Sequence, residues 1–281
     1  MAEVVAILGQ GVVDAAAPIL HADDLGAVRG DGCFETINVR AGQPWQLEPH
    51  LARMVRSADK LDVDFPDLAD IRELCAAALA AFGAEREGAL RLICTRGLES
   101  GSAPTFYATL NPVADAVIAK RRDGLRLTAL SLGYPVDERG KSPWLLGGAK
   151  TLSYAVTMSA QRYATSNGYD DALWTSSDGY AFEGPTSTLL WLEGDTLYTV
   201  PADTGILAGT TSAYLLDNAP QLGLRPAEAR VRVDDLPSKD GVWMASSVRG
   251  IAPVIKLDEA TLKESARTAD LQRLAGFEVP A

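Results

Sequence analysis

Histidine and cysteine are scarce in this sequence of 281 residues. It holds two histidines, His21 and His50, and three cysteines, Cys33, Cys75 and Cys94, all far apart. Because there is no CxxC spacing and no histidine beside a cysteine, the sequence predicts neither a zinc site nor a disulfide framework. Two separated histidines also offer no metal site of their own and no Ser-His-Asp triad. We therefore expect the thiols to lie in the core of a cytoplasmic protein.

Long apolar runs and dense basic clusters are also lacking. The longest run of low polarity, Cys75 to Ala81, is far shorter than a membrane span, and no basic segment precedes the apolar N-terminal stretch. The net charge is -11, and the densest basic run is Lys120-Arg121-Arg122, which we interpret as a solvated linker. We therefore expect a protein that binds neither a membrane nor nucleic acid.

Strands and helices are grouped in the first part of the chain, without strict alternation. Pro49 opens a helical pattern, and a second helix is expected over roughly 67–82. Alternating residues predict strands at 3–8, 31–40, 45–47, 89–96 and 107–110. Such grouping is typical of an α+β domain.

A proline and the basic run between Asn111 and Gly124 indicate a boundary between two domains. We expect a smaller α+β domain over 1–117, a linker over 118–124 and a larger strand-rich domain over 125–281. A helical pattern in the second domain covers 152–163. Its predicted strands lie at 125–130, 171–174, 180–183, 189–192 and 196–200.

Two charged residues of the second domain lie in apolar surroundings. Lys150 opens the apolar helical run, and Glu183 lies in a strand that should be half-buried. Desolvation favours the neutral amine, which acts as nucleophile and base, and an unpaired carboxylate would be costly there. A snorkelling lysine and a structural ion pair would explain the same residues. If the two side chains share one site, they form the pair that pyridoxal phosphate needs, a Schiff-base lysine and an acid that keeps the pyridine nitrogen protonated.

The run GILAGTTS at 205–212 is a candidate phosphate site. A glycine-containing turn there delivers Thr210 and Thr211 to a helix N-terminus, which offers N–H groups, hydroxyls and a favourable dipole to an anion. Threonine at a helix start is more often a simple N-cap. Arg53 could add a bidentate phosphate contact, or it could be solvated on its amphipathic helix.

Arg96, at the end of the strand over 89–96, and Arg249, in the run ASSVRG, are candidate binders of a substrate carboxylate. Each is equally explained as a surface charge at the end of a strand.

Seven blocks, in order along nearly the whole chain, carry a resemblance to a known family. They are GDGCFET, EPHLARM, CTRG, AKTLSYA, NGYDDALWTSSDGYAFEGPTSTLLW, GILAGTT and WMASSVRGIAPV. The sequence resembles the fold-type IV (class IV) pyridoxal-phosphate enzymes, which comprise branched-chain aminotransferases, D-amino-acid aminotransferases and 4-amino-4-deoxychorismate lyases. The resemblance implies a two-domain α+β fold like that of D-amino-acid aminotransferase, with the cofactor between the domains, and a homodimer.

The resemblance also implies roles for individual residues. Lys150 matches the Schiff-base lysine and Glu183 the partner of the pyridine nitrogen. Tyr154 lies close to the position of a tyrosine on the cofactor's ring oxygen, although its offset from the lysine is one residue shorter than in the family. The positions that match phosphate contacts are Arg53, Thr210, Thr211 and Ser247.

The substrate and the subclass follow from fewer residues. The resemblance implies that Phe34 and Thr36 face a small-molecule substrate, and that Arg249 meets its carboxylate; together with Arg96, this would suit a dicarboxylate. D-amino-acid aminotransferases have a histidine where this sequence has Leu98, and the branched-chain pattern GXTR is replaced by GTTS. What remains is most similar to the actinobacterial 4-amino-4-deoxychorismate lyases. We therefore expect a lyase that forms 4-aminobenzoate and pyruvate, with a D-amino-acid or branched-chain aminotransferase as the alternative.

Overall fold

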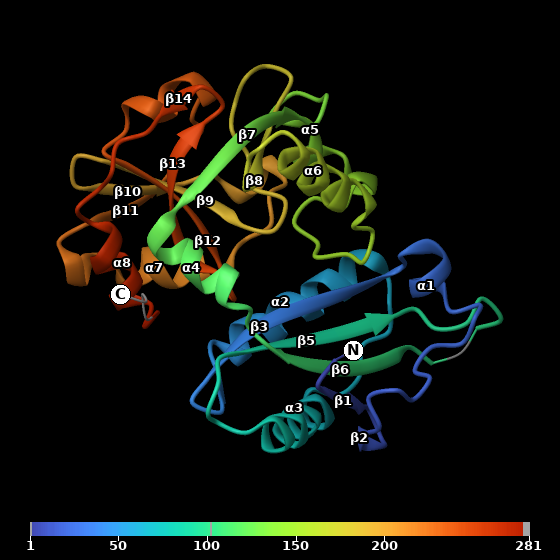
Figure 1. Cartoon of the computed structure of the whole chain (residues 1–281). Coiled ribbons are helices and arrows are strands. Elements are labelled where there is room, and N and C mark those ends of the chain that lie inside the picture. The colour runs from blue at the N-terminus through green and yellow to red at the C-terminus, as the bar shows by residue number, and fades with distance from the viewer. Residues whose placement is uncertain (1, 102, 278–281) are drawn as a thin grey trace. The chain divides into compact units, whose positions relative to one another are not determined.

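The computed structural model describes residues 2–101 and 103–277 and divides the chain into two compact units (Figure 1). The N-terminal unit comprises Met1–Ala114 together with Ala149–Tyr154. The C-terminal unit comprises Asp115–Gly148 together with Ala155–Ala281. The short segment Ala149–Tyr154, which contains Lys150, thus belongs to the first unit, whereas the sequence places it in the second domain.

An antiparallel sheet of six strands forms the centre of the N-terminal unit, in the order β2-β1-β6-β5-β3-β4. The strands are β1 (Val4–Ile7), β2 (Gly11–Val13), β3 (Gly32–Arg40), β4 (Gln43–Pro44), β5 (Gly88–Thr95) and β6 (Thr105–Pro112). Strands β1, β3, β5 and β6 confirm the alternation read from the sequence. The strand predicted over 45–47 is wrong, because β4 ends at Pro44 and a helix begins at Leu47.

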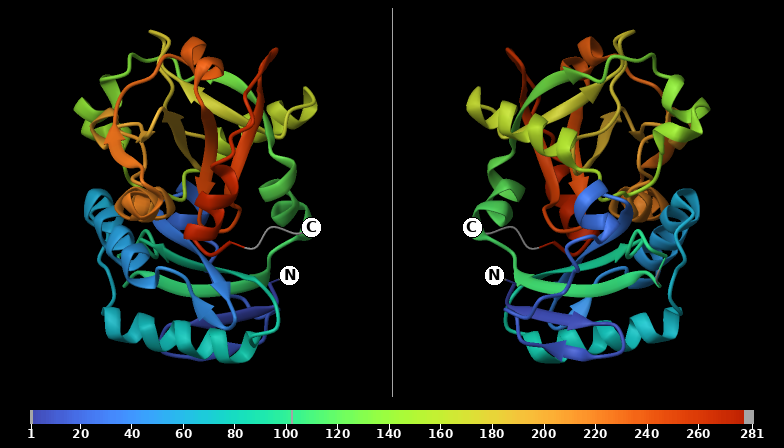
Figure 2. Two further views of the ribbon diagram at one scale, coloured as in Figure 1. Left: turned by 90° about the vertical axis from the view of Figure 1, so that its left-hand side faces the viewer. Right: turned by 90° about the vertical axis from the view of Figure 1, so that its right-hand side faces the viewer.

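The helices of this unit are α1 (Leu25–Arg29), α2 (Leu47–Leu61) and α3 (Leu68–Phe82). Helix α2 begins two residues before Pro49, and proline is tolerated there because N–H groups of a first helical turn have no intrahelical partner. Helix α3 packs against β1, β2 and β6 and lies across one face of the sheet in both views of Figure 2. The apolar faces of α2 and α3 and one face of the sheet form a single core.

The three cysteines are free thiols in the interior of the N-terminal unit, as expected from the sequence. In the part of the chain that the structure describes, no helix combines the length and the apolar character needed to cross a membrane.

A mixed sheet of eight strands forms the C-terminal unit, in the order β11-β10-β9-β12-β13-β7-β8 with β14 on β13. The strands are β7 (Leu125–Ser131), β8 (Asp171–Thr175), β9 (Thr188–Glu193), β10 (Thr196–Thr199), β11 (Arg225–Glu228), β12 (Gly241–Ser246), β13 (Gly250–Leu257) and β14 (Ala260–Thr261). Its α-helices are α4 (Asp115–Asp123), α5 (Glu138–Lys141), α6 (Ala155–Ser166), α7 (Thr210–Asn218) and α8 (Thr268–Leu274). The second unit is strand-rich, as the sequence predicts.

The predicted linker over 118–124 is wrong, because most of it is helix α4. Arg121, which we expected in solvent, is buried and donates hydrogen bonds to the carbonyl oxygens of Val248 (3.0 Å) and Arg249 (2.9 Å). Its own carbonyl accepts a hydrogen bond of 2.6 Å from Gln272 of α8. These contacts place α4 within the C-terminal unit.

Two further elements differ from their predictions around the candidate site. The helix expected over 152–163 begins only at Ala155, and Lys150 lies in an extended segment. The strand expected over 180–183 is reduced to isolated bridges from Tyr180 to Arg232 and from Ala181 to Thr175. Leu152 pairs with Gly32, and Tyr180 and Ala181 pair with Arg232 and Val231. Pairing with such distant segments is not revealed by local periodicity.

Candidate active site

The segment around Lys150 is fixed by three hydrogen bonds within the N-terminal unit. The amide of Phe34 donates to the Lys150 carbonyl (3.1 Å), and the amide of Leu152 donates to the Gly32 carbonyl (2.9 Å). The Lys150 amide donates to the hydroxyl of Ser57 on α2 (3.1 Å). The segment therefore pairs with the start of β3 and is also held by α2, so the direction of the lysine side chain is set by two elements.

Aromatic rings surround the amine of Lys150. Its Nζ atom lies 3.3 Å from the hydroxyl of Tyr154 and 4.4 Å from the ring centre of Phe34. The two rings meet edge to face, with centres 5.0 Å apart. The structure thus brings together Lys150, Tyr154 and Phe34, three residues predicted for the site. Thr36 follows Phe34 on β3 and is half-buried, on the same face of the sheet because side chains alternate.

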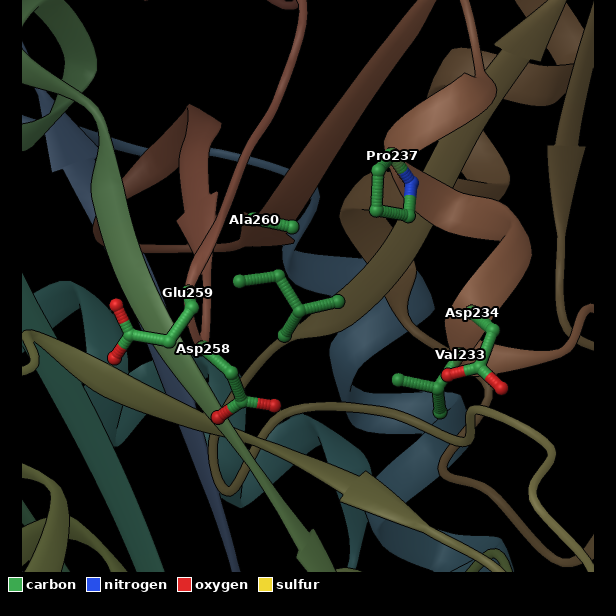
Figure 3. Close-up of a pocket in the computed structure, with 7 residues that line it drawn as sticks. Val233, Asp234, Pro237, Asp258, Glu259 and Ala260 are labelled. Carbon is green, nitrogen blue, oxygen red and sulfur yellow. The ribbon is translucent and has the colours of Figure 1, made fainter.

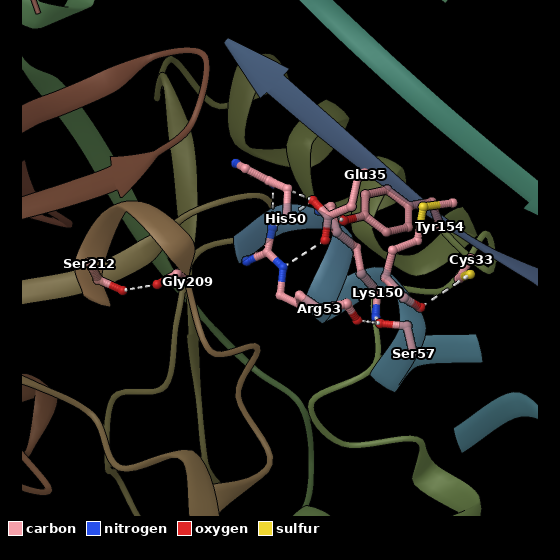
Figure 4. A network of polar contacts seen from close by, with 10 residues as sticks. Cys33, Glu35, His50, Arg53, Ser57, Lys150, Tyr154, Gly209 and Ser212 are labelled. Atoms are coloured by element: carbon pink, nitrogen blue, oxygen red, sulfur yellow. Dashed lines mark hydrogen bonds and ion pairs between the residues drawn. The ribbon is translucent and has the colours of Figure 1, made fainter. Parts of the chain in front are cut away.

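A buried ion pair joins Arg53 to Glu35 on the opposite, helix-facing side of β3 (Figure 4). The Nε and Nη2 atoms of Arg53 each donate to one Glu35 oxygen at 2.7 Å. His50 Nδ1 lies 2.7 Å from the same carboxylate, and all three side chains are buried. Arg53, predicted as a phosphate ligand, is therefore anchored by a residue that the sequence analysis missed. Glu35 lies on the same face of β3 as the core residues Cys33 and Ile37. A carboxylate at such a core position is the signal in the sequence that could have identified it.

Burial and charge act in opposite directions in this cluster. Burial alone raises the pKa of Glu35, but the charge of Arg53 and hydrogen bonds from Arg53 and His50 outweigh it, so the pKa falls to about 2. Burial lowers the pKa of His50 and outweighs the neighbouring carboxylate. At neutral pH the cluster therefore contains an ionised Glu35, a charged Arg53 and a neutral His50 that donates from Nδ1.

Glu183 lies in the C-terminal unit with a partner on each carboxylate oxygen. Arg139 of α5 donates to Oε1 (3.2 Å), and the amide of Leu207 donates to Oε2 (3.1 Å). The Glu183 side chain is 12% exposed. Arg139 is a second residue that sequence reasoning missed, because a charged turn such as ERGK gives no signal that it faces inward.

The predicted phosphate turn leads into α7 as expected. The helix begins at Thr210 with Gly209 as its N-cap, and no side chain caps it. A Cβ atom at Gly209 would lie 2.2 Å from Oγ1 of Thr188, so the turn needs a glycine. The buried Thr211 hydroxyl has no hydrogen-bond partner among the described residues. An unpaired buried hydroxyl at a helix N-terminus fits a phosphate group, which would accept its hydrogen bond.

The two arginines predicted to bind a substrate carboxylate already have protein partners. Arg96 pairs with Asp31 and donates to the carbonyl oxygens of Leu61 and Asp62, at the C-terminus of α2. Arg249 donates to Asp171 (3.0 Å) and Ser187 (2.9 Å), and both of those partners are buried.

Ser247 and Arg249 lie in the turn between β12 and β13. The C-terminal unit therefore contains the predicted residues Glu183, Thr210, Thr211, Ser247 and Arg249, and the N-terminal unit contains Phe34, Thr36, Arg53, Arg96, Lys150 and Tyr154.

A separate hollow of about 290 Å³ in the C-terminal unit involves none of these residues (Figure 3). It is lined by Val233, Asp234, Pro237, Leu257, Asp258, Glu259 and Ala260. Asp258 accepts hydrogen bonds from Thr128 and from the amide of Ala129, so it serves the packing of β7. We assign this hollow no function.

The substitution Glu35→Gln should destabilise the protein by about 3 to 5 kcal/mol, because it leaves the buried charge of Arg53 without its counter-ion. Urea unfolding of the cofactor-free protein measures this change. Glu48→Gln is the matched control, since Glu48 of α2 pairs with Arg72 in solvent and its loss should have little effect. Equal losses in both variants would contradict the account of the cluster.

Acidification should destabilise the protein through His50. The pKa of His50 is lowered in the folded protein, whereas in the unfolded chain it has the ordinary histidine value of 6.5. Below pH 6.5 the unfolded chain therefore takes up a proton that the folded chain does not. The free energy of unfolding should therefore decrease between pH 6.5 and about 5. His50→Gln should flatten this slope, whereas His21→Gln, which changes the exposed histidine, should keep it. Identical slopes in wild type and His50→Gln would refute the assignment.

Comparisons with known proteins identify the family of this chain. A family profile described as amino-transferase class IV matches residues 32–257. The chain is 44% identical over 250 residues to a bifunctional aminodeoxychorismate lyase / D-amino acid transaminase of Mycobacterium tuberculosis, with 86% of each chain covered.

Solved structures give the same result. A hypothetical aminotransferase from Mycobacterium tuberculosis, in a PLP-bound form, is 41% identical with a TM-score of 0.93, and 97% of each chain is covered. The fold IV-transaminase CpuTA1 from Curtobacterium pusillum is 38% identical with a TM-score of 0.91, covering 97% of this chain and 96% of that one. These similarities confirm the α+β fold of type IV that the sequence predicts, and the chain belongs to the class IV aminotransferase family.

Proposed function

We propose that the protein is a pyridoxal-phosphate-dependent 4-amino-4-deoxychorismate lyase, which forms 4-aminobenzoate and pyruvate in the folate pathway. The observation that carries this proposal is the 44% identity to a protein named for that lyase activity and for D-amino acid transamination. Pyridoxal 5'-phosphate is the cofactor, in keeping with the class IV family and its PLP-bound relative.

The cofactor contacts follow from the residues described above. Lys150 would bind the cofactor covalently, and Glu183 would pair with its ring nitrogen. The residues that would hold its phosphate are Arg53, Thr210, Thr211 and Ser247. The pair with Glu35 holds the Arg53 guanidinium through Nε and Nη2 and so fixes its orientation. When bound, the cofactor supplies an electron-accepting ring that stabilises negative charge at the carbon bearing the substrate amine.

The amine of Lys150 would then move the protons of the reaction. Released by the substrate amine, it removes the proton from the amine-bearing carbon, and a proton is delivered to the enolpyruvyl methylene. The carbon–oxygen bond to that group breaks, pyruvate leaves, and the ring becomes aromatic, which makes the step irreversible. The Tyr154 hydroxyl, 3.3 Å from Nζ, can both donate and accept and is suited to relay this proton.

Phe34 supports this role by packing against the amine, with its ring centre 4.4 Å from Nζ, which limits the positions that the amine can take. Arg96 and Arg249 stay proposed ligands of the two substrate carboxylates, and Thr36 a proposed substrate contact. Because both arginines are already paired, substrate binding would have to add to or exchange their present partners.

The alternative is a D-amino-acid or branched-chain aminotransferase. The same relative is named for D-amino acid transamination as well, and this name supports the aminotransferase alternative. Both reactions use Lys150 for the first proton transfer, and they diverge only in the carbon to which the proton is returned. We further propose that the enzyme is a homodimer, as the family resemblance implies, and that it is cytoplasmic, which its three free cysteines favour.

Two assays on cofactor-loaded protein separate these activities. Added aminodeoxychorismate should yield 4-aminobenzoate, whereas an amino acid alone, D-alanine or leucine, should convert the cofactor to its amine form only if the protein is a transaminase. Lys150→Ala should abolish product formation, while Lys141→Ala, which changes an exposed lysine, should keep it. Absence of 4-aminobenzoate from the loaded wild type would reject the lyase assignment.

A further inference from the structure

The guanidinium group of Arg139 lies against the carboxylate of Glu183, with Nη1 3.2 Å from Oε1. Arg139 lies on α5 and Leu207 on the loop before α7, so the two carboxylate oxygens are held from two segments far apart in the sequence. A carboxylate bonded at both oxygens has its plane fixed. Fixing the plane also fixes the directions in which the carboxylate oxygens can accept further hydrogen bonds.

Close glycine packing fixes Arg139 itself. A Cβ atom at Gly205 would lie 2.8 Å from Cγ of Arg139, and one at Gly147 would lie 2.9 Å from the Arg139 carbonyl oxygen. A Cβ atom at Gly140 would lie 1.7 Å from the carbonyl oxygen of Asp203. These glycines let α5 approach the 203–205 segment directly. The stem of Arg139 is therefore held against backbone and is not free to turn into solvent.

The same contacts connect Glu183 with the phosphate turn. Gly148 donates to the Gly205 carbonyl (3.1 Å), and Leu207, which binds Glu183, precedes the helix N-cap Gly209 by two residues. Glu183, Arg139 and the start of α7 thus form one connected structure within the C-terminal unit. Substitution of Arg139 should therefore alter the position of the Glu183 carboxylate, because that carboxylate is its direct partner.

We propose that Arg139 is a positioning residue for Glu183, which keeps this carboxylate charged and oriented toward the pyridine nitrogen of the cofactor. The proposal rests on the proposed role of Glu183. An arginine beside a carboxylate favours the ionised form, and the ionised form is the one that pairs with a protonated ring nitrogen. Without Arg139, the Glu183 carboxylate loses a charge-assisted hydrogen bond at Oε1, so its charged form is less favoured.

The test compares binding of pyridoxal phosphate with binding of its 1-deaza analogue, in which a C–H group replaces the ring nitrogen. The dissociation constant of the analogue, divided by that of pyridoxal phosphate, reports the contact between Glu183 and the ring nitrogen. Both constants are measured on full-length cofactor-free protein. Arg139→Met should reduce this ratio about tenfold, as expected for one hydrogen bond to a charged group. Arg139→Lys, which keeps the positive charge, should retain most of the wild-type ratio.

Arg126→Met is the matched control, because it also removes an arginine–carboxylate pair, with Asp170, from the C-terminal unit. It should leave the ratio unchanged. A wild-type ratio in Arg139→Met would overturn the positioning role while leaving the proposed function intact. If wild type itself does not distinguish the two compounds, the assigned role of Glu183 fails as well. Thermal melting of each variant shows whether it is folded. If Arg139→Met does not fold, the test is made on Arg139→Lys, and a tenfold loss of the ratio in that variant would contradict the proposal.

Discussion

The pairing of Ala149–Tyr154 with the start of β3 is the constraint on which the site of the N-terminal unit depends. Two backbone hydrogen bonds join this segment to Gly32 and Phe34, and the Ser57 hydroxyl binds the amide of Lys150. The pairing brings the segment close to β3: a Cβ atom at Gly32 would lie 2.9 Å from a methyl group of Leu152 and 2.3 Å from the Cys94 carbonyl oxygen. A side chain at Gly32 would therefore clash with the backbone of β5 and with the Leu152 side chain of this segment.

Buried charges in both units are arranged as pairs that orient a functional group. Glu35 holds two nitrogen atoms of Arg53, and Arg139 holds one oxygen of Glu183. In the same way, Asp171 holds Arg249. Each partner reduces the cost of burying a charge and also limits the directions in which the remaining donors or acceptors can point. Removing a partner should therefore disturb the orientation of the functional side chain as well as lower the stability of the protein.

The elements that depend on local periodicity could be predicted from the sequence. Strands β3 and β5 and helix α3 lie where alternation and helical spacing place them, and α7 begins at the predicted threonines. Lys150 is predicted from the sequence as a site residue, but its extended conformation is not, because the partner of that segment lies more than 100 residues earlier. Pairing across such a distance leaves no trace in the local pattern.

The supporting residues of the site were harder to predict than the residues they support. Arg139 sits in a short charged helix that resembles an exposed turn, and only its packing against Gly205 reveals that it faces inward. Glu35 is a carboxylate at a core position of an alternating strand, and this position indicates a buried partner. The partners, His50 and Arg53, are known only from the structure. The linker predicted over 118–124 failed for a related reason, since the burial of Arg121 depends on carbonyl groups near residue 248.

The central claim is that Lys150 is the residue to which the cofactor is attached. Reduction of the cofactor-loaded protein with borohydride makes that attachment permanent, and mass spectrometry of its peptides then locates the modified lysine. The account predicts the pyridoxyl group on Lys150. Modification of another of the seven lysines, or of none, would contradict it.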